Sequence, residues 1–282
     1  MNRKESKNRM QEMEEKIDQN LKDIEHKLVV MSGKGGVGKS TVAANLATGL
    51  SLRGYDVGLL DCDMHGPSIP QIVGISYDEK PTGTDNSLNP ISTDYGLKVM
   101  SLGTLLPSED SPVVWRGPLK MKTIQQFLGD VNWGKLDYLV FDLPPGTGDE
   151  PLSIAQLIPD SDGAIIVTTP QEVALKTIRR SVNFAQKVEL PVFGLIENMS
   201  GFVCPHCGEK IEIFHSGGGE ELSNDLDIPF LGKIPLDPAV VESGEVGKPI
   251  VLEKNSSGAE AFDDIISRVE NWTRKKAGGE TG

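Results

Sequence analysis

The feature that most constrains this chain is a glycine-rich stretch at residues 28–41, LVVMSGKGGVGKST. It begins with a short apolar run that predicts a buried strand, and residues 39–50 carry apolar side chains at helical spacing. The turn between them fits the pattern G-x-x-x-x-G-K-[ST], in which consecutive backbone N–H groups wrap a phosphate at a helix N-terminus. The stretch therefore predicts a strand, a phosphate-binding loop and a helix.

We expect this loop to bind ATP together with Mg²⁺. Lys39 would reach the β- and γ-phosphates, and the Ser40 hydroxyl would hold the metal ion. A glycine-rich turn that binds nothing is the alternative, but the motif lies in the strand-to-helix context that it requires. The residues expected to contact the nucleotide are Gly33, Lys34, Gly35, Gly36, Val37, Gly38, Lys39, Ser40 and Thr41.

Two later strands are predicted to end in carboxylates. Residues 56–60 form an apolar run before Asp61 and Asp63, and residues 136–141 form another before Asp142. Ligands bind α/β sheets at the carboxyl ends of strands, so we interpret Asp63 as the residue that orients the attacking water and Asp61 as a neighbour of the Mg²⁺ shell. A solvated turn is the alternative for this pair. Asp142 matches a Walker B aspartate, which holds the water shell of Mg²⁺.

The rest of the chain alternates between strand and helix patterns. Such alternation predicts an α/β fold, a doubly wound and mainly parallel sheet with helices on both faces. Surface residues rich in Gly, Pro, Asp and Asn interrupt the pattern at 74–96. The other predicted strands are 97–102, 163–168, 191–196 and 229–234, and the other predicted helices are 118–128, 174–188, 219–226 and 258–274.

We expect one P-loop ATPase domain over residues 27–276, which is long enough to bury a substantial core. A charged amphipathic helix at 1–26 would precede it, packed on the domain or docking a partner, and a flexible tail at 277–282 would follow. No apolar stretch has the length of a membrane span or a secretory signal, which favours a cytoplasmic location. The net charge of −13 argues against nucleic-acid or membrane partners.

The three cysteines, an odd number, argue against a disulfide framework. Cys62 is interpreted as a small buried residue. Cys204 and Cys207 form a C-x-x-C turn that suits two thiolates on one metal centre, in a loop at 201–213. A redox pair would instead be expected at the start of a helix. A zinc site would need further ligands, for which the sequence offers His206 or His215.

A third interpretation of the cysteine pair uses symmetry. If the ATPase forms a two-fold dimer, Cys204 and Cys207 of both subunits would supply four thiolates around one cluster. One chain alone is two ligands short of that set.

The stretch GKGGVGKST resembles the deviant P-loop of the MinD, ParA, nitrogenase iron protein and Mrp group of dimeric ATPases. Together with DCDMHGPS, FDLPPGTGD and ENMSGFVCPHCG, it makes residues 28 to about 250 resemble the Mrp/ApbC iron–sulfur cluster carrier ATPases. The resemblance implies a homodimer that hydrolyses ATP slowly, binds a [4Fe–4S] cluster between its subunits and transfers it to apo-proteins.

The resemblance also implies roles for single residues. Lys34 would cross the dimer interface to the partner's nucleotide, as an arginine finger does. Asn198 would pair with the adenine edge, and the loop containing Pro235 and Asp237 would close over the base.

Two other functions remain open. A MinD- or ParA-like organiser of membrane or DNA would require a basic amphipathic C-terminal helix, of which residues 269–276 offer only a few basic residues. A zinc-stabilised dimeric nucleotide-binding module would use the same cysteine pair.

Overall fold

We describe a computed structural model of the chain. It describes residues 3–64, 66–84, 87–106, 117–204, 207, 209–211, 213, 216–253 and 256–277.

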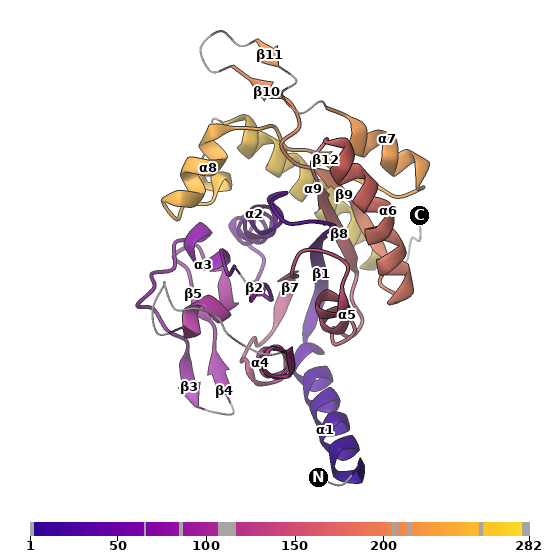
Figure 1. Cartoon of the computed structure of the whole chain (residues 1–282). Helices are drawn as coiled ribbons and strands as arrows, with labels where there is room; N and C mark the ends of the chain where they lie inside the picture. Colours follow the sequence, from indigo (N-terminus) through magenta and orange to yellow (C-terminus); the bar gives the residue numbers. More distant parts are fainter. Residues whose placement is uncertain are drawn as a thin grey trace.

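The centre of the molecule is an eight-stranded sheet with the order β12-β9-β8-β1-β7-β2-β6-β5 (Figure 1). Each neighbouring pair is parallel except β5 and β6, which pair antiparallel. The strands are β1 (Ile24–Ser32), β2 (Val57–Asp61), β5 (Ile91–Ser92), β6 (Lys98–Ser101), β7 (Leu136–Asp142), β8 (Gly163–Thr168), β9 (Val192–Glu197) and β12 (Phe230–Lys233).

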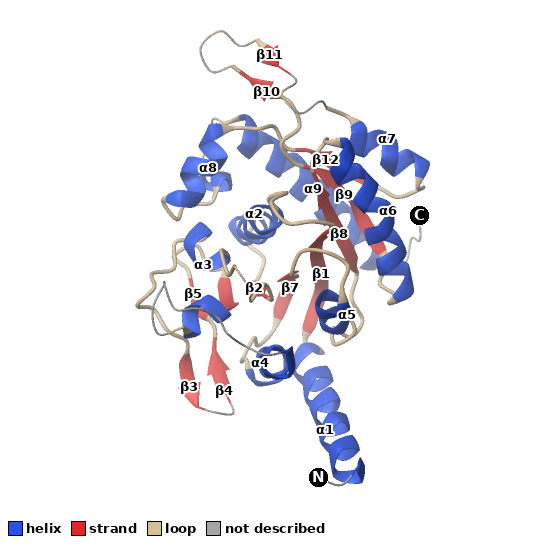
Figure 2. Ribbon diagram, viewed as in Figure 1, coloured by secondary structure: helices blue, strands red, loops and turns tan. Residues whose placement is uncertain are grey.

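Helices cover both faces of this sheet (Figure 2). They are α1 (Arg3–Leu21), α2 (Lys39–Leu52), α3 (Ile69–Ile72), α4 (Gly117–Asp130), α5 (Asp149–Ala155), α6 (Glu172–Lys187), α7 (Gly218–Asp225), α8 (Pro238–Glu245) and α9 (Ser257–Ala277). No described helix is both long and apolar enough to cross a bilayer.

The two faces of β1 bury two separate cores, because side chains alternate along a strand. Leu28 and Val30 join the apolar cluster that contains α2 and α9. Val29 and Met31 join the cluster that contains α4, α5 and α6. This arrangement confirms the predicted doubly wound sheet.

The first helix is shorter than predicted from the sequence. It ends at Leu21, and β1 already begins at Ile24, three residues before the start of the predicted domain at residue 27. The reason is tertiary, since Ile24 pairs with Leu136 of β7 and both side chains are buried.

Helix α1 packs against α4. Ile17 and Leu21 are fully buried, and Lys16 forms an ion pair with Asp130 at the end of α4. The Asn20 amide donates to two carbonyl oxygens at the C-terminal end of α4, that of Leu128 in its last turn at 2.6 Å and that of Val131 just after it at 2.9 Å. The C-terminal part of α1 therefore packs into the core of the domain through Ile17 and Leu21.

Two small hairpins lie outside the main sheet. Strands β3 (Thr82–Thr84) and β4 (Ser87–Asn89) pair antiparallel within the predicted surface segment 74–96. Strands β10 (Phe202–Val203) and β11 (Lys210–Ile211) pair antiparallel after β9 and project from the body of the molecule (Figure 1). We call residues 202–211 the cysteine hairpin.

Candidate nucleotide site and cysteine hairpin

The phosphate loop connects β1 to α2, as predicted. Gly36 (φ 76°) and Gly38 (φ 81°) adopt left-handed backbone conformations, which favour glycine. Gly38 is the N-cap of α2, and no side chain caps this helix end. The first N–H groups of α2 can therefore donate to a phosphate, which the helix dipole also favours.

Two glycines of the loop also allow close packing. A Cβ atom at Gly33 would lie 2.5 Å from Thr177 Oγ1, and one at Gly38 would lie 2.2 Å from Asn198 Nδ2. Both distances are far below van der Waals contact, so a larger residue would displace the loop from its neighbours.

Lys39, Ser40 and Asp142 form one buried polar cluster at the start of α2. Lys39 Nζ lies 2.5 Å from Asp142 Oδ1, and Ser40 Oγ donates to Asp142 Oδ2 at 2.6 Å. The Asp142 side chain is fully buried and that of Lys39 is 6% exposed. The structure thus brings together the three residues that the sequence predicted from two distant motifs.

Asp61 lies opposite Asp142, because the parallel register of β2 and β7 pairs these two positions. Its carboxylate accepts hydrogen bonds from Ser101 Oγ at 2.8 Å and from the Asp63 amide at 3.0 Å. Burial, and then the charge of Asp142, raise the pKa of Asp61 to about 8. Burial also raises the pKa of Asp142, although Lys39 opposes the shift.

This donor set fits Mg²⁺. The ion prefers oxygen ligands, and Asp61, Asp142 and Ser40 offer carboxylate and hydroxyl oxygens at one end of the sheet. Two buried carboxylates that repel each other would also gain from a bound cation. Ser101 is the member of this cluster that the sequence reasoning missed, and only the pairing of β2 with β6 reveals it.

The structure places two further predicted residues near the loop. Asp63 follows β2 and is half-buried, with its backbone amide bonded to Asp61. Lys34 Nζ donates to Gln171 Oε1 of the same chain at 3.3 Å. The predicted roles of Asp63 in orienting water and of Lys34 in the partner's site stay predictions.

The predicted adenine contacts occupy the neighbouring strand ends. Asn198 Nδ2 donates to the Val37 carbonyl oxygen at 2.9 Å, so this side chain supports the phosphate loop. The Asp237 carboxylate caps α8 through the Ala239 amide at 3.0 Å, and it also accepts from the Gly258 amide at 3.1 Å at the start of α9. Adenine recognition by Asn198, Pro235 and Asp237 stays a prediction. The pair Asp237 and Pro238 is itself a sequence signal for a helix N-terminus.

The two hairpin cysteines lie away from the phosphate loop. Cys204 directly follows β10, is half-buried, and its amide donates to the Glu209 carbonyl oxygen at 2.9 Å. Cys207 is exposed. The pair sits between two antiparallel strands, which disfavours the redox interpretation because that interpretation needs a helix N-terminus. The candidate zinc ligands His206 and His215 lie outside the described residues. Cys62 is fully buried, as predicted.

Comparison with known proteins identifies the family. A family model described as ParA, NUBPL iron-transfer P-loop NTPase, matches residues 23–270. The chain belongs to this family. A protein of Methanocaldococcus jannaschii named iron-sulfur cluster carrier protein is 49% identical over 94% of this chain and 90% of its own length. A Nematostella vectensis protein named cytosolic Fe-S cluster assembly factor NUBP2 homolog is 46% identical over 91% of this chain and 97% of its own length.

Solved structures agree with this assignment. The nucleotide-binding protein of Archaeoglobus fulgidus, solved in complex with ADP, is 40% identical with a TM-score of 0.77, over 88% of this chain and 96% of that one. The MinD cell division ATPase of Pyrococcus furiosus is 23% identical with a TM-score of 0.62, over 88% of this chain and all of that one. The second likeness shows the fold alone, and together they confirm the predicted MinD-like P-loop NTPase fold.

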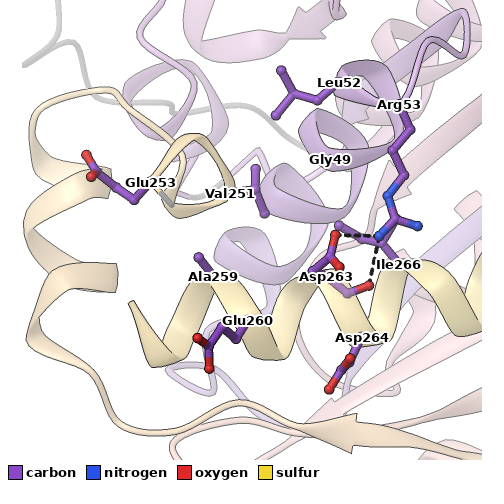
Figure 3. Close-up of a pocket in the computed structure, with 10 residues that line it drawn as sticks. All are labelled: Gly49, Leu52, Arg53, Val251, Glu253, Ala259, Glu260, Asp263, Asp264 and Ile266. Carbon is purple, nitrogen blue, oxygen red and sulfur yellow. Dashed lines mark hydrogen bonds and ion pairs between the residues drawn. The ribbon is translucent and has the colours of Figure 1, made fainter. Parts of the chain in front are cut away.

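This ParA-family NTPase also has a cavity of about 690 Å³ at the other end of α2, against α9 (Figure 3). Arg53 lies in it and pairs with Asp263 at 2.5 Å. Apart from Arg53, the charged side chains that line it within the described part of the chain are acidic and would repel the phosphates of a nucleotide. This acidic wall disfavours a nucleotide in the cavity, and its carboxylates are Glu253, Glu260, Asp263 and Asp264.

Proposed function

We propose that the protein is an ATP-dependent iron–sulfur cluster carrier, in which two copies of the chain hold one cluster as cargo and deliver it to apo-proteins. The observation that carries this proposal is the position of Cys204 and Cys207 on a hairpin that projects from a P-loop NTPase domain. The names of the relatives, iron-sulfur cluster carrier protein and Fe-S cluster assembly factor, support it.

The stoichiometry follows from ligand chemistry. Clusters of the [4Fe–4S] and [2Fe–2S] types take four thiolates, and each hairpin supplies two. A two-fold dimer brings the same surface of both subunits together, so two hairpins would complete one set. The exposed Cys207 is accessible to such a partner and to an acceptor protein. We assign a [4Fe–4S] cluster to this site, as the resemblance to Mrp/ApbC carriers implies.

ATP bound at the phosphate loop would supply the free energy for this carrier function. Bound Mg²⁺, held by Ser40, Asp142 and Asp61, would neutralise charge on the phosphates. Lys39 would bind the β- and γ-phosphates once it is released from its contact with Asp142. Asp63 would orient the attacking water.

The partner's side chain would complete this site. Lys34 follows the first glycine of the loop and would reach the nucleotide of the other subunit. ATP binding and dimer closure would then be one event, which links the nucleotide state to the spacing of the two hairpins. We place this reaction in the cytoplasm, without a nucleic-acid or membrane partner.

The decisive experiment removes the two thiols. The double variant Cys204→Ala, Cys207→Ala should lose the visible absorption and the bound iron and sulfide after anaerobic reconstitution, because half of the coordination set disappears from each subunit. Its affinity for ADP should stay within about twofold of the wild type, because the hairpin lies outside the phosphate loop.

Cys62→Ala is the matched control, since it removes a buried thiol that is not on the hairpin and should retain the cluster. Equal iron and sulfide content in the double variant would contradict the proposal. Zinc without sulfide in the wild-type protein would instead identify the zinc-stabilised module.

A further inference from the structure

The buried carboxylate of Glu197 holds both ends of the cysteine hairpin. Glu197 is the last residue of β9 and is fully buried. It accepts hydrogen bonds from Ser200 Oγ at 2.5 Å, from the Gly217 amide at 2.8 Å and from the Gly219 amide at 2.5 Å. Ser200 precedes the hairpin and the two glycines follow it, so one side chain joins the segments that enter and leave it.

A second contact joins the same two segments, before and after the hairpin. Ser200 Oγ lies 3.0 Å from Ser216 Oγ, which directly precedes Gly217. Gly217 adopts a left-handed conformation (φ 91°) as the N-cap of α7, and a Cβ atom at Gly219 would lie 2.9 Å from Glu197 Oε2. We call Ser200, Ser216, Gly217 and Gly219 the hairpin base. Its geometry is fixed by backbone conformation and by close packing on Glu197.

The residue after Glu197 contacts the phosphate loop. Asn198 donates to the Val37 carbonyl oxygen from its side chain, and its backbone amide donates to the Thr168 carbonyl oxygen at 2.7 Å. The side-chain nitrogen Nδ2 of Asn198 also packs on Gly38, where no Cβ atom would fit. A shift of the loop on phosphate binding would therefore displace Asn198, which is one peptide bond from Glu197.

The loop predicted to cover the base is attached to the same segment. The Ser200 amide donates to the Ile234 carbonyl oxygen at 2.9 Å, and the Leu236 amide donates to the Gly201 carbonyl oxygen at 2.8 Å. Phe202, the first residue of the hairpin, forms an isolated bridge with Leu236. Both predicted contact regions of the nucleotide thus bond to residues 198–202.

From these contacts we infer that Glu197 is a positioning residue, which transmits the nucleotide state from the phosphate loop to the cysteine hairpin. Asn198 moves with the phosphate loop, because its side chain is bonded to Val37. The peptide bond between Asn198 and Glu197 passes this movement to Glu197. The Glu197 carboxylate then moves the hairpin base, because it is bonded to Ser200, Gly217 and Gly219. The expected effect on a bound cluster rests on the proposed carrier function. The coupling between nucleotide and hairpin does not, because it concerns the cluster-free chain.

The test compares Glu197→Gln with wild type by hydrogen exchange of the cluster-free protein. The glutamine keeps the size of the side chain but replaces one acceptor oxygen with a donor that faces backbone N–H groups. In the wild type, a non-hydrolysable ATP analogue with Mg²⁺ should slow exchange in peptides covering residues 200–219. In the variant, these peptides should exchange at least about tenfold faster, and the nucleotide should no longer change their rate.

Nucleotide affinity separates transmission from damage to the site. Glu197→Gln should bind ADP within about twofold of the wild type, since its carboxylate does not contact the loop. Glu221→Gln is the matched control, because this exposed carboxylate lies on α7 outside the hairpin base, and it should behave as the wild type. A hairpin that still responds to nucleotide in Glu197→Gln, or that does not respond in the wild type, would overturn the inference.

A milder variant covers the case in which Glu197→Gln does not fold. Ser200→Ala removes one donor to Glu197 and the contact with Ser216, but it leaves both backbone bonds to the carboxylate. Its nucleotide response in residues 200–219 should fall by at least about half. A full wild-type response in Ser200→Ala would overturn the inference as well.

The loaded protein then distinguishes this inference from the carrier function. With a reconstituted cluster, nucleotide should change the rate of cluster loss in the wild type and leave it unchanged in Glu197→Gln. If the wild type never binds a cluster while its hairpin responds to nucleotide, the carrier proposal fails and the coupling stands.

Discussion

Gly38 is the residue at which the phosphate loop should tolerate substitution least. Its φ of 81° is unfavourable for alanine, and a Cβ atom there would lie 2.2 Å from Asn198 Nδ2. We expect Gly38→Ala to lower the free energy of unfolding by about 2–4 kcal/mol, as strain and overpacking add. Chemical denaturation measures this change.

Gly35→Ala is the control from the same loop. A Cβ atom at Gly35 would meet no atom within 4 Å, and its φ lies outside the left-handed region. This variant should stay within about 0.5 kcal/mol of the wild type. Equal destabilisation of both variants would mean that contacts with Asn198 do not decide the conformation of the loop.

Asp162, which directly precedes β8, joins the sheet to the last helix. Its carboxylate accepts from the Lys27 amide at 2.8 Å, contacts His26 Nδ1 at 3.3 Å and pairs with Lys276 of α9 at 2.7 Å. Burial opposes ionisation, but these bonds from His26, Lys276 and Lys27 together hold the pKa of Asp162 below its usual value.

A carboxylate with a lowered pKa stabilises the fold above the pKa of the unfolded chain and loses that effect as the pH falls through its folded pKa. Asp162→Asn should therefore cost about 1–3 kcal/mol near pH 7, and the difference from the wild type should shrink below about pH 4. Thermal unfolding across this pH range tests the prediction. A difference that grows on acidification would show that another group carries the effect.

The elements show where sequence reasoning succeeds and where it stops. Apolar runs predicted the central strands, because buried parallel strands carry continuous hydrophobic stretches. The start of β1 was predicted too late because it carries polar residues: His26 is buried against Tyr138, with ring centroids 5.1 Å apart, and bonds to Asp162. The short helices α3, α5 and α8 were not predicted, whereas the equally short α7 was; each of the three carries a proline near its start, which indicates a turn when only the sequence is considered.

The candidate site divides in the same way. Lys39, Ser40 and Asp142 could be predicted because each stands in a motif with a known chemical role. Glu197 could not, because its partners are backbone amides of Gly217 and Gly219, which lie 20 and 22 residues away and carry no recognisable pattern. Likewise, the bond between Asn198 and Val37 spans 161 residues and arises only when β9 packs near β1.

In the whole molecule, the phosphate loop and the cysteine hairpin follow different strands of one sheet. The phosphate loop lies at the carboxyl end of β1 in the centre, and the cysteine hairpin leaves β9 towards one edge. In the single chain, Lys34 bonds to Gln171 at the N-cap of α6. The proposed function requires this lysine to change partners when two chains meet.

Lys34→Ala therefore tests the dimer. This variant should bind ATP within about twofold of the wild type but hydrolyse it at least about a hundredfold more slowly, because a charge-neutralising group is missing from the partner's site. Phosphate release measures the rate, and Lys22→Ala, which removes an exposed lysine far from the loop, should keep full activity.

Mixing two inactive variants decides whether Lys34 acts across the interface. Asp63→Ala should also be inactive, because it cannot orient water, yet it still carries Lys34. In a mixed dimer, the site of the Lys34→Ala chain keeps Asp63 and receives Lys34 from its partner. A 1:1 mixture forms mixed dimers for about half of its material, each with one complete site, so it should recover about a quarter of the wild-type rate. If the mixture stays inactive while both chains dimerise with ATP, Lys34 acts within its own subunit and the shared site is wrong.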